Sequence, residues 1–101
     1  MLTKQMLQRS ERGIDNSEFY MVLVTDNMLN DEQCLYEWNY AKRLKKPFML
    51  VIKAGTKIPD EMLSGINMKY KASFNDDKDL EKISLDIKNV IGEIKFIDSH
   101  E

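Results

Sequence analysis

The sequence predicts an α/β fold in which parallel strands alternate with helices, and three features of its first half indicate this class. Residues 19–24 form an unbroken apolar run, a helical pattern follows, and a second apolar run occupies residues 48–52. Apolar runs without polar alternation are typical of strands that a parallel sheet buries on both faces. Strand, helix and strand within about 35 residues make a βαβ unit, and we expect its crossover to be right-handed.

The helix of this unit carries signals at both ends. Asn30 is a good N-cap, and Gln33 stands three residues later as its capping-box partner. Basic residues fill the last turn up to Lys45, where they complement the negative end of the helix dipole. Pro47 disfavours helical backbone in the residue before it, so the helix ends there.

Two residues of this helix, Cys34 and Trp38, lie one turn apart. We expect both to face the sheet, with Leu23 and Leu50 among their neighbours. A free cysteine is most often a buried apolar residue, so packing explains Cys34 better than a reactive thiolate at a helix start does. Trp38 is likewise better explained as a core residue than as a platform for base stacking.

Further elements are indicated on both sides of the βαβ unit. Residues 2–12 predict a helix that stops at Gly13. A loop at 53–59 is marked by Gly and Pro, helical turns follow at 60–66, and residues 70–74 suggest a short third strand. Apolar residues at helical spacing then predict a last helix; they are Leu80, Ile83, Leu85, Ile87, Val90, Ile91 and Ile94.

Length, composition and charge bound the class of protein. A chain of 101 residues makes one domain, and 43% apolar content is ordinary for a globular protein. The net charge of −2 gives no indication of a nucleic-acid or membrane surface. No stretch approaches the ~18 apolar residues of a spanning helix, and the start lacks the apolar core of a signal peptide. The single cysteine excludes an internal disulfide and fits a reducing, cytoplasmic setting.

Three stretches, in the same order, resemble the Toll/interleukin-1 receptor (TIR) domain family. Residues 13–29, GIDNSEFYMVLVTDNML, are similar to the family's "gI..S.f.ivvlS.nyl". Residues 33–41, QCLYEWNYA, are similar to "WC..El..A", and Lys46-Pro47 with the next apolar run is similar to "kPiipv". The resemblance covers roughly residues 2–95, which correspond only to the C-terminal two thirds of a full TIR domain.

The resemblance implies a three-layer flavodoxin-like parallel sheet, truncated to about three strands, in a single TIR-like domain over residues 1–101. In family members that cleave NAD, the glutamate of "WC..E" is the catalytic residue, and this role carries onto Glu37. Glu37 is expected in the second turn of its helix, close to the carboxyl end of the first strand, where open parallel sheets bind ligands. Thr25, Asp26 and Asn27 are the expected substrate-binding residues. NAD is then a substrate, and no cofactor or metal is implied.

The chain also departs from the family pattern. The tryptophan before the cysteine is Gln33 here, and the serine that ends the strand is Thr25. The family's first two strands and their loops, which supply much of the nucleotide pocket in TIR enzymes, have no counterpart. We therefore expect the isolated chain to have weak activity or none.

The chemistry of NAD cleavage nevertheless suits one carboxylate. Breaking the nicotinamide–ribose bond passes through an oxocarbenium-like state, as in glycoside hydrolysis, and a carboxylate stabilises the growing positive charge. Nicotinamide leaves as a neutral group, so no general acid is required. The plain alternative for Glu37 is a solvated surface glutamate, since its neighbours on the same helix face include no basic residue.

Other polar residues are better explained by structure than by chemistry. Aspartates in two loops are candidates for a Mg²⁺ site, but the paired acids of such sites are absent, so solvation explains them better. The basic cluster at the end of the central helix complements the helix dipole. The only histidine lies in the tail and is irrelevant to catalysis. The aspartates are Asp26, Asp76 and Asp77, and the tail histidine is His100. The basic cluster consists of Lys42, Arg43, Lys45 and Lys46.

Three functions remain open. The chain is an NAD-cleaving TIR-like enzyme, or a fragment of one, in immune-type signalling; or it is a TIR-like module that assembles with itself or with other TIR domains without catalysis. The third is a nucleoside deoxyribosyltransferase-like enzyme, whose "yElgyA...gKP" stretch is similar to residues 36–41 and Lys46-Pro47. The Ser17 and Cys34 positions match the TIR pattern better.

The missing start of the fold leads to an expectation about assembly. In a flavodoxin-like sheet the strand at 19–24 is flanked on both sides, and without the first two strands it becomes an edge. It carries no Lys, Pro or bulge of the kind that discourages edge pairing. We therefore expect a twofold dimer in which two such strands pair or bared apolar faces pack.

Overall fold

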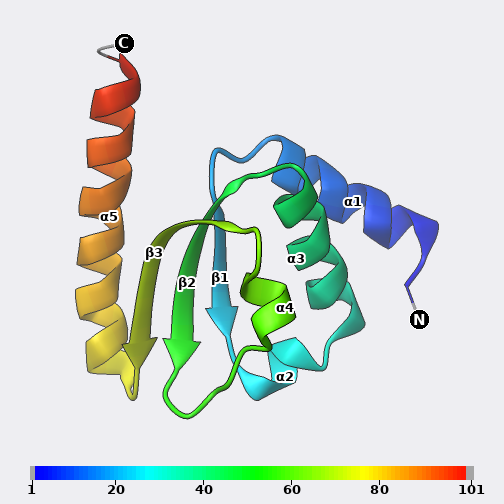
Figure 1. Cartoon of the computed structure of the whole chain (residues 1–101), viewed down its shortest axis with the longest axis horizontal. Coiled ribbons are helices and arrows are strands. Elements are labelled where there is room, and N and C mark those ends of the chain that lie inside the picture. The colour runs from blue at the N-terminus through cyan, green and yellow to red at the C-terminus, as the bar shows by residue number, and fades with distance from the viewer. Residues whose placement is uncertain (1, 100–101) are drawn as a thin grey trace.

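The computed structural model describes residues 2–99, and side chains as far as residue 93. Three parallel strands form one sheet in the order β1-β2-β3, and helices flank it on both faces (Figure 1). This arrangement confirms the predicted α/β class with a truncated, three-stranded parallel sheet. The strands are β1 (Tyr20–Val24), β2 (Pro47–Lys53) and β3 (Asn67–Phe74).

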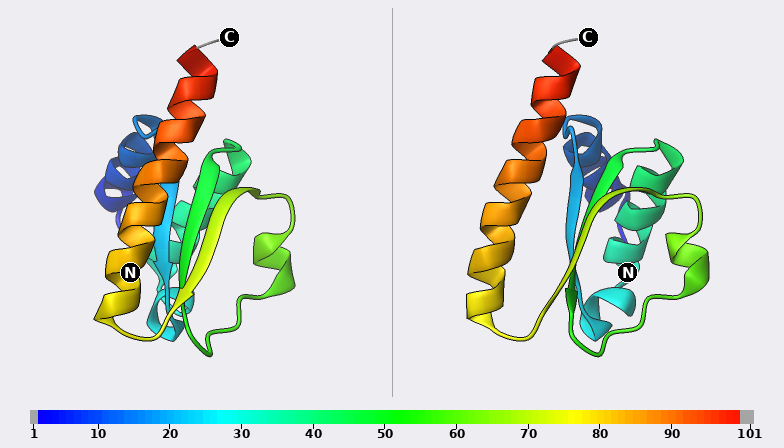
Figure 2. Two further views of the ribbon diagram at one scale, coloured as in Figure 1. Left: turned by 90° about the vertical axis from the view of Figure 1, so that its left-hand side faces the viewer. Right: turned by 60° about the vertical axis from the view of Figure 1, so that its left-hand side comes forward.

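The helices divide between the two faces of the sheet. In Figure 2, α5 lies alone on one face, and α1, α3 and α4 lie on the other. The short helix α2 turns the chain at the end of β1 (Figure 1). Among the described residues, no helix combines the length and the apolar character needed to cross a membrane. The helices are α1 (Lys4–Asp15), α2 (Asp26–Leu29), α3 (Glu32–Arg43), α4 (Asp60–Leu63) and α5 (Asp77–Ser99).

Strand β2 is the centre of the molecule. Its residues 48–52 are all buried, as the apolar run predicts, and they alternate between two core clusters. We call these the α3-side core and the α5-side core. The α3-side core contains Phe48, Leu50 and Ile52 with Trp38, Ala41, Val24, Met28 and Ile14. The α5-side core contains Met49 and Val51 with Phe74, Ile83 and Ile87.

Strand β1 differs from the prediction, because it is buried on one face only. Val24 is fully buried in the α3-side core, and Tyr20 and Val22 pack against that core. On the other face Met21 is 59% exposed and Leu23 is 50% exposed. The reason is that β1 is an edge strand. The buried part of the α5-side core includes Met49 and Val51, the β2 residues beside Met21 and Leu23, but not Met21 and Leu23 themselves. Leu23 is therefore not a neighbour of Trp38 as expected, whereas Leu50 shares its core.

The start of α3 also differs from the prediction by one residue. Asp31, not Asn30, is the N-cap, and its carboxylate accepts a hydrogen bond of 2.9 Å from the backbone N–H of Cys34. Residues that the sequence marks as a break instead form α2, capped by the Thr25 hydroxyl. Asn30 closes that short helix and donates to the Asp26 carbonyl. Because α2 uses Asn30, the next residue caps α3.

Other boundaries differ as well. Helix α3 ends at Arg43 and not at Lys45, whose φ of 59° is not helical. Helix α1 does not stop at Gly13 but runs on to Asp15, and the N–H of Asn16 donates to the Arg12 carbonyl at 3.0 Å. A glycine costs only about 1 kcal/mol in a helix, and burial of Ile14 in the α3-side core favours the extra turn. Strand β3 begins three residues earlier than predicted, and the tail histidine, His100, lies outside the described residues.

Candidate functional site

Glu37 lies in the middle of α3 and is half-buried against α1. The hydroxyl of Ser10, a buried residue of α1, donates a 2.8 Å hydrogen bond to Glu37 Oε1. The side-chain amide of Gln33 donates in turn to the Ser10 hydroxyl at 3.2 Å. This chain of hydrogen bonds fixes the Glu37 carboxylate. The described contacts give Glu37 Oε2 no protein partner, so that oxygen is available to a ligand.

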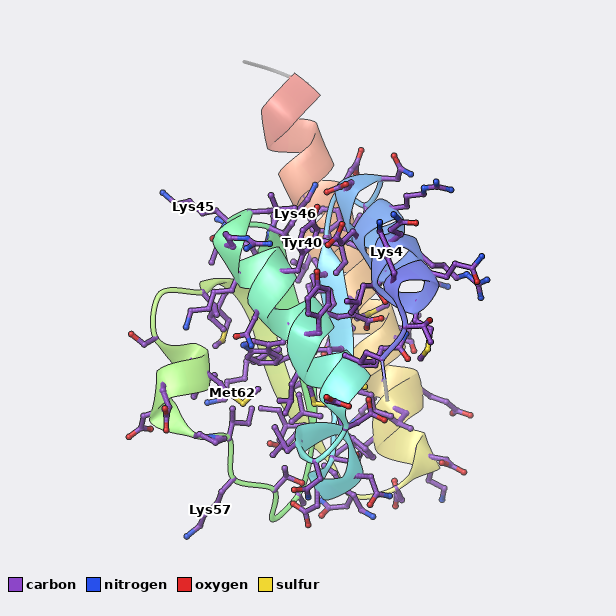
Figure 3. The ribbon with its side chains drawn as sticks, turned by 90° about the vertical axis from the view of Figure 1, so that its right-hand side faces the viewer. Lys4, Tyr40, Lys45, Lys46, Lys57 and Met62 are labelled. Carbon is purple, nitrogen blue, oxygen red and sulfur yellow. The ribbon has the colours of Figure 1, made fainter. Side chains whose placement is uncertain are left out.

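Helix α1 is held against α3 by a row of polar contacts, which brings Ser10 to Glu37. The Tyr36 hydroxyl donates to the Glu11 carboxylate, and the Tyr40 hydroxyl donates to Asp15 at 2.7 Å. That hydrogen bond raises the pKa of Tyr40 to about 12. Just beyond the two helices, the Lys46 ammonium donates to the Ser17 carbonyl at 2.9 Å. Lys46 and Tyr40 both donate to Asp15, so they lie near one another (Figure 3).

A hollow of about 500 Å³ opens between α1, the edge of β1 and α3. Arg9 and Ser10 line it from α1, Tyr20 from β1, and Gln33 and Glu37 from α3. Burial, reinforced by the negative charge of Glu37, raises the pKa of the Tyr20 phenol, so Tyr20 is protonated at neutral pH. The hollow therefore combines a carboxylate, a neutral hydroxyl donor, an amide and a guanidinium. Such a set of groups is suited to a ligand with several hydroxyls and an anionic part.

The other expected site residues lie elsewhere. Thr25, Asp26 and Asn27 line a separate hollow of about 300 Å³ with residues 53–56, where β1 and β2 end. The Glu37 hollow takes its strand residues from the amino-terminal half of β1. The structure therefore divides the single expected site between two hollows. Glu37 is therefore not close to the carboxyl end of β1 as expected, because α3 runs back along the strand and carries Glu37 toward its amino-terminal half (Figure 1).

Sequence reasoning missed Ser10, Arg9 and Tyr20 as members of the site. Ser10 is 27 residues from Glu37 along the chain, and no local spacing connects them. One signal was present: Ser10 stands four residues before Ile14, so both occupy one face of the helix. A serine on the face that carries the buried Ile14 is a candidate for a specific buried hydrogen bond.

Cys34 and Trp38 have the structural roles that the sequence suggests. Burial, then the neighbouring Asp31 carboxylate, raises the pKa of the Cys34 thiol, which disfavours a reactive thiolate. Trp38 is fully buried, 5.0 Å from the ring of Phe48 in an edge-to-face pair. Its indole N–H donates to the Met62 carbonyl at 3.0 Å.

The loop aspartates do not gather in the described part of the chain. Asp76 accepts a 3.1 Å hydrogen bond from the backbone N–H of Asp79 at the start of α5. Asp26 lies in α2, beside the hollow at the end of β1. No group of histidine, cysteine and acidic side chains that would hold a metal ion occurs among the described residues.

Comparisons of the chain with models of known protein families, with curated proteins and with solved structures found no match. The resemblance to TIR domains therefore rests on the three sequence stretches quoted above.

Proposed function

We propose that the Glu37 hollow binds a nucleotide and that the chain is a TIR-like domain of the NAD-cleaving type. One observation carries the proposal. The Glu37 carboxylate is half-buried in a hollow of about 500 Å³, with Oε1 fixed by Ser10 and Oε2 without a protein partner in the described contacts. The order and spacing of the TIR-like stretches support NAD as the substrate, and the reaction needs no cofactor.

Glu37 acts on the ribose in this proposal. Oε2 accepts hydrogen bonds from ribose hydroxyls, and the negative charge stabilises the positive charge that grows at the anomeric carbon as nicotinamide leaves. The Ser10 and Gln33 hydrogen bonds hold the carboxylate in one orientation before the substrate binds, so less reorganisation is needed in the transition state. Water then attacks the ribose and completes hydrolysis.

Two further residues of the hollow fit a dinucleotide. The guanidinium of Arg9 complements the negative charge of a diphosphate. The Tyr20 hydroxyl stays protonated beside Glu37 and donates a hydrogen bond to a polar atom of the ligand.

The first experiment measures binding, because turnover by the isolated chain is expected to be weak. NAD is titrated into the ¹⁵N-labelled chain and amide shifts are followed by NMR. We expect the largest shifts at Ser10, Tyr20, Gln33 and Glu37. Shifts centred instead on residues 25–27 and 53–56 would move the nucleotide to the hollow at the strand ends and overturn the assignment to Glu37.

The second experiment measures nicotinamide release by chromatography. Replacement of Glu37 by Gln keeps the size of the side chain and removes the charge, so we expect a rate loss of about 10²–10³, the usual cost of removing one transition-state stabiliser. Glu32→Gln is the matched control, since Glu32 is an exposed residue of the first turn of the same helix. Undiminished release by a folded Glu37→Gln chain would end the proposal.

Chromatography of the products and the NMR titration together separate the two alternative functions. A 2′-deoxynucleoside that is cleaved while NAD is not would favour a deoxyribosyltransferase-like enzyme. A chain that binds neither substrate would favour a TIR-like assembly module that catalyses nothing.

A further inference from the structure

The outer edge of β1 is unpaired in the part of the chain that the structure describes. The strand order β1-β2-β3 gives β1 one neighbour, so a row of backbone N–H and C=O groups faces away from the sheet. Stable proteins protect such edges with lysine, proline or a bulge. The sequence of β1 is Tyr-Met-Val-Leu-Val, and the one register shift of the sheet lies between β2 and β3.

The same strand carries a bare apolar strip, formed by Met21 and Leu23. Their register partners on β2 are Met49 and Val51, which are 0% and 5% exposed in the α5-side core. The apolar layer under α5 thus continues onto β1 without a cover. A bare strip next to an unpaired edge indicates that another strand covers both.

We propose that the covering strand is β1 of a second copy of this chain, paired antiparallel about a twofold axis at Val22. In this register Val22 lies opposite the partner's Val22, and Met21 lies opposite the partner's Leu23. A twofold axis normal to the sheet keeps the faces matched, so the two apolar strips merge into one patch of four side chains. All five residues of β1 are paired, and the two sheets join into one.

The sequence of β1 itself argues for a second copy as the occupant. An antiparallel partner must present apolar side chains on the strip face in reverse order. The strand β1 meets this condition because Met21 and Leu23 stand symmetrically about its central residue. The net charge of −2 opposes association of two copies only weakly, and a closed twofold dimer is the commonest assembly. The proposal rests on β1 and does not require the function proposed for Glu37, although Tyr20 and Met21 of β1 also line the Glu37 hollow.

The first test uses light scattering over a dilution series from about 100 to 1 μM, the range in which moderate dimers dissociate. We expect a dimer that dissociates on dilution, and at least a tenfold higher dissociation constant for Leu23→Lys. Leu85→Lys is the matched control, since Leu85 is 63% exposed on α5, and it should leave the dimer unchanged. Circular dichroism checks that each variant is folded.

The second test determines the register. A Met21→Cys chain and a Leu23→Cys chain, both with Cys34→Ala, are mixed and oxidised. We expect mixed disulfides between the two variants to exceed those within either one, because directly opposed side chains lie closest in an antiparallel pair. Any of three results would overturn the proposal. They are a monomer throughout the dilution series, a dimer that Leu23→Lys does not weaken, and disulfides that form only between two Leu23→Cys chains.

Discussion

Trp38 contacts more of the structure than its place in one helix suggests. It lies in α3, its ring packs edge-to-face on Phe48 of β2, and its indole N–H bonds the carbonyl of Met62 in α4. One side chain thus ties two helices and the central strand together, and all of its surface is buried.

Replacing Trp38 by Ala should cost about 3–5 kcal/mol of unfolding free energy, the usual range for large aromatic truncations. That is most of the stability of a small domain. Trp38→Phe keeps most of the packing but leaves the Met62 carbonyl without its donor, so a smaller loss of about 1–3 kcal/mol is expected. Denaturant unfolding measures both. A Trp38→Ala loss below that of Trp38→Phe would contradict this account.

The N-terminus of α3 depends on a single carboxylate. The Asp31 side chain accepts from the backbone N–H of Cys34, and this hydrogen bond is the main reason that the pKa of Asp31 lies below its ordinary value of 3.8. A carboxyl group with a lowered pKa in the folded state stabilises the fold in its charged form. The stabilisation is fully present above the unfolded pKa and is lost as the pH falls through the lowered folded pKa.

We therefore expect the melting temperature of Asp31→Ala to fall at neutral pH, and the difference from the natural chain to shrink as the pH falls below about 4, the unfolded carboxyl value. Asp31→Asn is the informative comparison, because asparagine caps a helix well without a charge. It should melt close to the natural chain at neutral pH. Asn30→Ala is the control. If it lowers the melting temperature as much as Asp31→Ala does, Asn30 and not Asp31 is the N-cap of α3.

Strand β2 and helix α3 could be predicted from the sequence because their signals are strong and local. The apolar run at 48–52 is buried on both faces as expected, whereas the similar run in β1 is not. An apolar run alone cannot show which face a distant helix covers, and α5 is far from β1 in the sequence. The cap of α3 was misplaced because Asn30 and Asp31 are equally good caps, and only α2 decides between them.

The surroundings of Glu37 could not be predicted, for a similar reason. Glu37 was singled out by its motif and stays a candidate, but its partner Ser10 comes from another helix, and only the packing of α1 on α3 brings them together. Thr25, Asp26 and Asn27 were expected near Glu37, since these three residues and the helix that carries Glu37 follow the same strand. They line another hollow at the carboxyl end of β1, whereas α3 runs back along the strand and carries Glu37 toward the amino-terminal half.

The whole molecule consists of two layers of packing that share one strand. The α3-side core takes Phe48, Leu50 and Ile52, and the α5-side core takes Met49 and Val51. Each core is small, and each includes a fully buried side chain of β2. Figures 1 and 2 show β2 between the other two strands and between the helices of both faces.

This sharing makes the protein one cooperative unit. If α5 detaches, Met49 and Val51 become exposed to water. This weakens β2, and with it the α3-side core to which the alternate residues of β2 belong. We expect a single thermal transition with equal calorimetric and van't Hoff enthalpies, and amide exchange in β2 and in α5 as far as Val90 that occurs only through global unfolding. Earlier exchange of the first turns of α5 than of β2 would show that the layers open separately.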